Sequence, residues 1–185
     1  MSGTRLADLA RGDLAWLRAF LSGEGTRGTS LAAQLDARHD TGTQDTLLTW
    51  AAGHGQAEAA RLLLEGGASV GATNGGGASA LVLASEGGHL DCARLLLEAG
   101  AAMDQAKENG ATPLLIASQK GHLECAQLLL EAGAAVAHAD AEGRMPLNVA
   151  CYKGHLEIAR LLSDAGAVIN QADEYGTTPL YMACQ

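Results

Sequence analysis

Residues 107–139 read KENGATPLLIASQKGHLECAQLLLEAGAAVAHA, and the rest of the chain repeats this stretch. Its Thr-Pro-Leu motif, its leucine triplet and its glycines each return at a spacing of 33 residues. A fixed period of this size predicts an array of stacked structural repeats. The segments equivalent to Thr-Pro-Leu are Ser-Ala-Leu at 79–81, Met-Pro-Leu at 145–147 and Thr-Pro-Leu at 178–180.

Each repeat is expected to hold two short helices. Thr112 is a good N-cap, and Pro113 suits the first helical position, where its missing N–H costs nothing. This first helix should stop at Gly121, which tolerates positive φ. A second helix is expected at 123–131, before Gly133. Helices this short are marginal in water, so the repeats must bury their leucines by stacking on one another.

The repeat resembles the ankyrin repeat. The residues that match the family pattern are Gly110, Thr112, Pro113, Leu114, Ala117, Gly121, His122, Leu128 to Leu130, Gly133 and Ala134. The histidine that follows Leu in the family is replaced here by Thr49, Val82, Leu115, Asn148 and Tyr181. The resemblance implies an all-α solenoid of stacked helix-turn-helix units with hairpin-like turns.

The repeats are expected to form one array over residues 1–185. Its last repeat begins a first helix but has no second one, so we expect the chain to be a fragment of a longer array. The expected segments are a degenerate N-terminal repeat at 4–22, an insertion loop at 23–40 with a helical turn near 31–35, full repeats at 41–73, 74–106, 107–139 and 140–172, and a truncated repeat at 173–185.

The composition of the chain indicates which kinds of binding partner and which cellular compartment to expect. The formal net charge is −9, which argues against nucleic acid or an anionic membrane as a partner. The chain has neither an apolar run of transmembrane length nor an apolar signal at its N-terminus. We therefore expect an intracellular protein, cytoplasmic or nuclear, that is a monomer, binds a protein partner and needs no cofactor.

The cysteines and histidines recur in register, which favours a structural role. Cys92 and Cys125 are 33 residues apart, as are Cys151 and Cys184. Stacked helices lie about 8–10 Å apart, too far for a disulfide, and no Cys-x-x-Cys motif is present. Buried, reduced cysteines are therefore preferred over a metal site or a disulfide. The histidines at 89, 122 and 155 also share one register and are expected to be structural.

For the remaining motifs, a structural role explains the residues better than a chemical function does. The Asn-Gly-Gly-Gly run at 74–77 lacks the lysine of a phosphate-binding loop and is expected to be a hairpin turn. Trp16 and Trp50 are expected in the core. Asn170 resembles the hairpin asparagine that is hydroxylated in some ankyrin proteins, but a structural role is preferred. No unrepeated set of catalytic side chains stands out, so an enzyme is not expected.

Residues that vary between repeats are the candidates for binding. In the ankyrin family the partner surface is the concave side, formed by the turn tips and the exposed ends of the first helices. Tyr and Arg often dominate interfaces, which points to Arg144, Tyr152 and Tyr175 in the C-terminal half, with solvated surface residues as the alternative. His54 is a weaker contact candidate. The predicted partner-binding residues are Glu108, Asn109, Gln119, Lys120, Glu142, Arg144, Tyr152, Lys153 and Tyr175.

The resemblance implies a non-catalytic protein–protein interaction module that acts as a scaffold or adaptor. The alternative is a targeting or regulatory ankyrin segment of a larger enzyme or channel, whose active domain lies outside this chain. Sequence beyond Gln185 would separate the two, because further repeats favour the module and a catalytic or membrane domain favours the segment.

Overall fold

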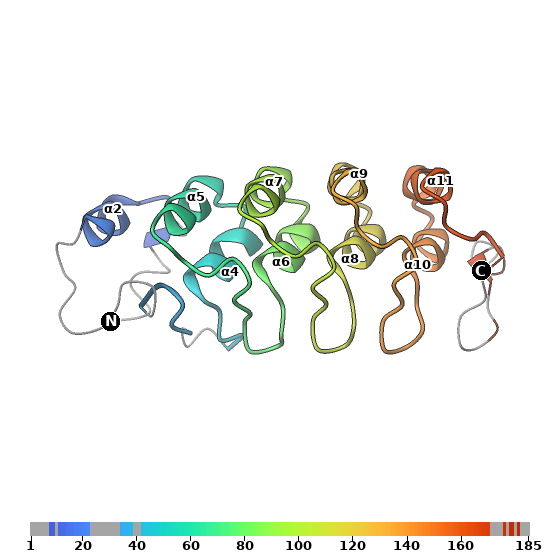
Figure 1. The fold of residues 1–185 in the computed structure, drawn as a ribbon, viewed down its shortest axis with the longest axis horizontal. Helices are drawn as coiled ribbons and strands as arrows, with labels where there is room; N and C mark the ends of the chain where they lie inside the picture. Colours follow the sequence, from blue (N-terminus) through green and yellow to red (C-terminus); the bar gives the residue numbers. More distant parts are fainter. Residues whose placement is uncertain are drawn as a thin grey trace. The chain divides into compact units, whose positions relative to one another are not determined.

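A computed structural model describes residues 8, 9, 11–22, 34–38, 42–170, 176, 178, 179 and 181 (Figure 1). The chain divides into two compact units, Met1–Ala102 and Met103–Gln185. The described residues form helices joined by turns, and their one β-bridge, between Thr73 and Ser79, is isolated within a turn. The predicted all-α repeat fold is confirmed.

The first unit contains α2 (Ala15–Leu21), α4 (Leu47–Gly53), α5 (Ala57–Glu65), α6 (Ala80–Gly87) and α7 (Leu90–Glu98). Helices α4 and α6 are the first helices of successive repeats and pack side by side (Figure 1). Each packs on its own second helix, α5 or α7, and these two also pack together. Helix α2 lies where the degenerate N-terminal repeat was predicted.

The second unit repeats this arrangement with α8 (Pro113–Lys120), α9 (Leu123–Glu131), α10 (Pro146–Tyr152) and α11 (Leu156–Asp164). Helices α8 and α10 pack together, and each contacts its own second helix. The first helices of the four repeats begin at residues 47, 80, 113 and 146, which are 33 residues apart.

The helix ends follow from local sequence. The side-chain oxygens of Thr46, Ser79 and Thr112 each accept a hydrogen bond from a backbone N–H in the first turn of the following helix. Met145 replaces this cap in the fourth repeat and is buried instead. Gly121 ends α8 with φ 84° and ψ 21°, the left-handed conformation predicted for it.

The core lies between the helix layers. The leucines at 63, 96, 129 and 162 occupy the same place in their second helices and are fully buried. Cys92 and Cys125 are buried free thiols, as predicted, whereas Cys151 is free but half-buried. Cys184 lies outside the described residues.

The recurring histidines link one repeat to the next. The His89 ring contacts the backbone oxygen of Gly53 through Nε2 at 3.2 Å. His155 makes the equivalent contact to the Gln119 oxygen at 3.3 Å. Each ring thus satisfies a carbonyl near the end of the preceding first helix, which has no partner within that helix. This is the structural role expected of these histidines.

Trp16 and Trp50 differ from the prediction, because both are only partly buried. Trp50 stacks on His54, with ring centroids 3.9 Å apart and planes 15° apart. Its register holds the smaller side chains Leu83 and Val149 in other repeats. Val149 is buried, whereas Leu83 is half-buried like Trp50.

The end of the predicted insertion loop is packed against the fold. Gln34 and Leu35 are helical, and Leu35 is fully buried. Asp36 Oδ1 accepts a 2.9 Å bond from the Ser69 N–H. Most of 23–40 and most of the predicted truncated repeat lie outside the described residues.

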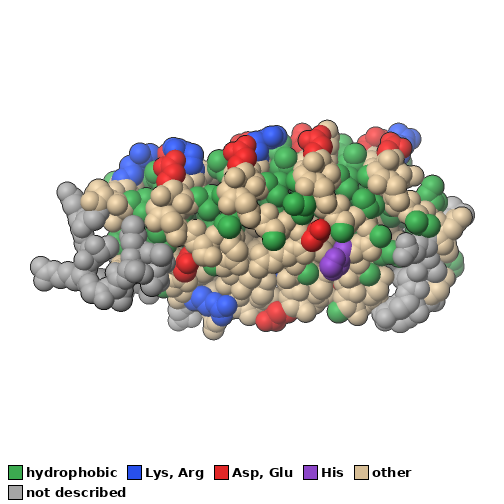
Figure 2. Space-filling model, viewed as in Figure 1, with side chains coloured by type: hydrophobic (Ala, Val, Ile, Leu, Met, Phe, Trp, Pro, Cys, Tyr) green, Lys and Arg blue, Asp and Glu red, His purple; other side chains and the backbone are tan. Residues whose placement is uncertain are grey.

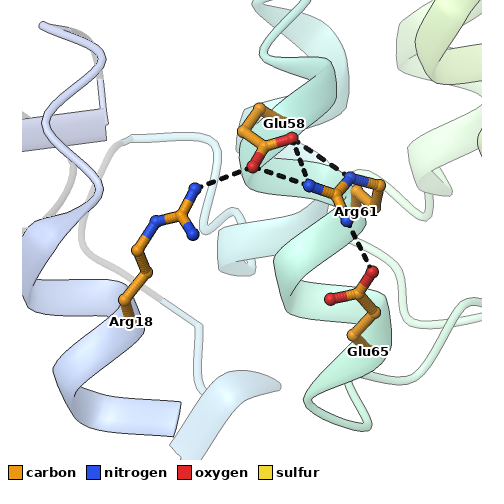
Figure 3. Close-up of polar contacts among 4 residues, drawn as sticks. All are labelled: Arg18, Glu58, Arg61 and Glu65. Atoms are coloured by element: carbon orange, nitrogen blue, oxygen red, sulfur yellow. Dashed lines mark hydrogen bonds and ion pairs between the residues drawn. The ribbon is translucent and has the colours of Figure 1, made fainter.

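Charged side chains gather along the outer surface of the second helices (Figure 2). In the first unit, Arg18 of α2 lies 2.9 Å from Glu58, which also pairs with Arg61, and Arg61 pairs with Glu65 at 2.7 Å (Figure 3). The hydrogen bond from Arg61 lowers the pKa of Glu58. Such exposed pairs add little stability. No helix among the described residues is both long and apolar enough to cross a membrane.

Candidate functional site

The turn tips of the second unit are held by hydrogen bonds within each turn. In the third repeat, the Lys107 N–H donates to the Ala111 oxygen at 3.1 Å, and Asn109 Oδ1 accepts from the Ala111 N–H at 3.2 Å. In the fourth repeat, Asp140 Oδ1 accepts from the N–H groups of Glu142 and Arg144 at 3.0 and 2.9 Å. These bonds fix the backbone from which the predicted tip residues project.

Neighbouring tips of this unit are also joined to each other. The Ala141 N–H donates to the Asn109 oxygen at 2.9 Å. Gly110 lies so close to the next turn that an added Cβ would be 2.9 Å from the Ala141 nitrogen. The exposed residues Glu108, Asn109 and Glu142 are therefore presented side by side on connected tips.

Arg144 is part of the turn itself. Its Nε donates to Asp140 Oδ2 at 2.8 Å, and its guanidinium also lies 3.1 Å from Glu142. The Asp140 side chain is fully buried, whereas that of Arg144 is about one-third exposed. The hydrogen bond to Asp140 raises the pKa of Arg144. Arg144 thus neutralises a buried carboxylate and presents only part of its guanidinium to a partner.

Four of the predicted residues line one hollow in the second unit. Gln119 comes from α8, Arg144 from the turn, and Tyr152 and Lys153 from the end of α10. The hollow has a volume of about 230 Å³, and Asn148 and Val149 complete its lining.

Tyr152 is the most prominent side chain of this hollow. It is 54% exposed, and Lys153 Nζ lies 5.3 Å from the centre of its ring, within the range of a cation–π contact. Lys120 is exposed at the end of α8. Tyr175 lies outside the described residues.

A second hollow lies at the equivalent register of the first unit, and sequence reasoning missed it. It has a volume of about 340 Å³. Only His54 had been singled out as a contact, and Trp50 had been assigned to the core. The residues that line this hollow are Thr43, Asp45, Thr49, Trp50, Gly53, His54, Asn74 and Leu83.

The described residues contain no cluster suited to a metal ion, and their cysteines are unreactive. In the part of the chain that the structure describes, no three His, Cys, Asp or Glu side chains come together as a metal site requires. Burial raises the pKa of the Cys92 thiol to about 11 and also raises those of Cys125 and Cys151. Thiols of this kind are poor nucleophiles at neutral pH.

Comparison with protein families gives a match over nearly the whole chain. The model described as "Ankyrin repeats (3 copies)" matches residues 11–105, 48–140, 96–173 and 134–185. The chain belongs to the ankyrin-repeat family. Ankyrin repeats are in general protein–protein interaction modules and are typically non-catalytic. The comparison with curated proteins finds no match.

Proposed function

We propose that this ankyrin-repeat protein is a scaffold or adaptor that binds a partner protein through the first helices and turn tips of its second unit. The observation that carries the proposal is the exposed Tyr152 beside a hollow that also receives Gln119, Arg144 and Lys153. Since cysteines stay reduced inside cells, the free thiols of Cys92 and Cys125 support an intracellular setting.

Tyr152 has the properties of an interface anchor. Tyrosine offers a large rigid surface with a polar tip, and the energy of an interface is concentrated in a few such residues. Lys153 Nζ lies over one face of the ring. Gln119 provides a hydrogen-bonding group in the same hollow, and the exposed tip residues Glu108, Asn109 and Glu142 provide further ones in the same unit. This combination gives an aromatic centre with a polar rim, the usual anatomy of a protein interface.

The proposal is tested by comparative capture with the full chain as bait. Proteins retained from a lysate of the source cells are quantified for the wild type, for Tyr152→Ala and for Gln127→Ala. Gln127 is an exposed residue of α9, which makes its variant a matched surface control. A partner that depends on the proposed surface is lost with Tyr152→Ala and retained by the control.

The captured partner is then purified and titrated against each variant. We expect Tyr152→Ala to weaken binding by about tenfold or more, as for an interface hot spot, with an unchanged unfolding midpoint. Arg144 is not a suitable test residue, because its removal would leave Asp140 buried without its counter-ion. If the Tyr152→Ala variant is folded and every captured protein binds it as well as the wild type, the proposed surface is wrong.

A further inference from the structure

Three large apolar side chains are exposed on and directly after α11. Leu156, the first residue of the helix, is 66% exposed, whereas Leu123 at the same register of α9 is 38% exposed. Val168 and Ile169, in the turn that follows α11, are each more than half exposed. Large apolar side chains that are exposed together mark surfaces for interaction.

Leu156 and Ile169 line a groove of about 450 Å³ beside α11, here called the α11 groove. Figure 1 shows α9 on one side of α11 and no described helix on the other. Helix α9 packs against α11, and its Ala126 is fully buried. Ala159, at the same register of α11, lines the groove and is only half-buried. The groove is thus a helix-packing face that no described helix covers.

Two opposite charges lie on this face, one helical turn apart. Arg160 and Asp164 both line the α11 groove, and both are exposed. Arg160 contacts Glu157 at 3.1 Å through Nη1 alone. A guanidinium has five N–H donors, so Arg160 can bind a second carboxylate. Arg61 of α5 already pairs with two carboxylates in this way.

The face is complementary to a second copy of itself. Where two α11 helices run antiparallel about the level of residue 162, Arg160 of each copy lies opposite Asp164 of the other. Leu156 then lies at the end of the opposite helix, where Val168 and Ile169 are exposed. An axis at the level of residue 160 would instead bring the two Arg160 side chains together. Charge therefore selects the first register, and two-fold symmetry makes each of its contacts twice.

We propose that the second unit forms a two-fold symmetric dimer with a second copy of this chain, through antiparallel packing of α11 on α11. Leu156, Val168 and Ile169 of each copy supply the apolar contact, and ion pairs between Arg160 and Asp164 flank the axis. The dimer takes the place of the monomer expected from the sequence. Its surface is separate from that of Tyr152, and either one can exist without the other.

The full chain is examined by sedimentation equilibrium at concentrations up to about 1 mM. In salt of about 0.15 M the Debye length is about 8 Å, so the repulsion between two copies of net charge −9 is screened more than ion pairs in contact. The mass should rise from that of one chain to twice that value. Leu156→Gln should weaken the dimer by at least about tenfold, since an apolar contact is lost from both copies.

Reversal of the two charges tests the register. Arg160→Asp and Asp164→Arg should each weaken the dimer by at least about fivefold, because each places like charges opposite one another at two symmetric positions. The double variant restores opposite charges and should bind within about threefold of the wild type. Arg94→Asp is the matched control, because Arg94 is exposed on α7 at the register of Arg160, and it should leave the dimer unchanged.

Three outcomes would overturn the proposal: the mass of one chain at every concentration, a dimer that Leu156→Gln does not weaken, or charge reversals whose effects the double variant does not restore. If a helix of a different protein covers this face instead, the first of these outcomes results. Circular dichroism checks the fold of each variant, and if a charge variant does not fold, Leu156→Gln decides. Tyr152→Ala should leave the dimer unchanged, so this experiment and the capture experiment fail independently.

Discussion

Replacing Gly121 by alanine should destabilise the second unit through two separate effects. Gly121 has φ 84°, and a non-glycine residue in this left-handed region costs about 1 kcal/mol. An added Cβ would also lie 2.6 Å from Cε1 of the His155 ring. The ring would have to move from the Gln119 oxygen, 3.3 Å away, and lose a hydrogen bond worth about 1 kcal/mol. We expect a total loss of about 2 kcal/mol.

Gly154 offers a matched control for the backbone effect. Its φ is 74°, and an added Cβ would have no neighbour within 4 Å. Gly154→Ala should therefore lose only the left-handed contribution of about 1 kcal/mol. In a His155→Ala background, Gly121→Ala should lower the free energy of unfolding by only about 1 kcal/mol, the same loss as for Gly154→Ala. The double-mutant cycle would then show a coupling of about 1 kcal/mol between Gly121 and His155.

The measurement is urea unfolding of the full chain followed by circular dichroism. Hydrogen exchange of the second-unit amides should accompany it, because repeat arrays need not unfold in a single step. Equal losses for Gly121→Ala and Gly154→Ala would refute the proposed clash. So would a loss at Gly121 that His155→Ala does not change, since the ring would then have no part in it.

Three further perturbations follow from particular contacts. Gln44 has φ 53°, and Gln44→Gly should raise the free energy of unfolding in urea by about 0.5 kcal/mol, because relief of the left-handed strain exceeds the added entropy of the unfolded chain; a loss of stability would contradict this. Arg144→Ala should lower the free energy of unfolding by about 1–2 kcal/mol, because the buried Asp140 is left without its cation. An unchanged free energy of unfolding would show that the ion pair is not needed for stability. Since burial raises the pKa of Cys92 to about 11 from an ordinary value of 9.0, its thiolate fraction at pH 8 should be roughly 100-fold below that of a free thiol. Mass spectrometry should then show slower alkylation of Cys92 than of the half-buried Cys151, and equal rates would contradict the assigned burial.

The helices could be predicted because several local signals agree in most of the repeats. Thr112 and Gly121 mark the two ends of α8 through a side-chain cap and a left-handed backbone, and both features depend on a few adjacent residues. The 33-residue period then predicts helices with the same bounds in the other repeats. It also places Gln119 and Tyr152 at equivalent positions in neighbouring first helices, which explains why the structure brings them to one hollow.

Other features depend on side-chain size and on turn geometry, which the period does not contain. Trp50 shares its register with the buried Val149 and with Leu83, which is half-buried as Trp50 is, so the period alone does not determine burial at this position. Arg144 was predicted from its residue type to be a binding residue. Its bond to Asp140 arises because the turn brings residues 140 and 144 together, and a sequence spacing of four does not by itself indicate that contact.

In both hollows, a charged residue that lines the surface also stabilises the turn. In many repeat proteins these two roles belong to different residues. In the second unit, Arg144 lines the hollow and also neutralises the buried Asp140. In the first unit, Asp45 lines the hollow and also receives hydrogen bonds from Thr49 and Asn74. A change of charge at either position therefore alters the turn as well as the surface. Tyr152 is 54% exposed at the end of α10, so its substitution should separate binding from stability more cleanly than substitution of Arg144.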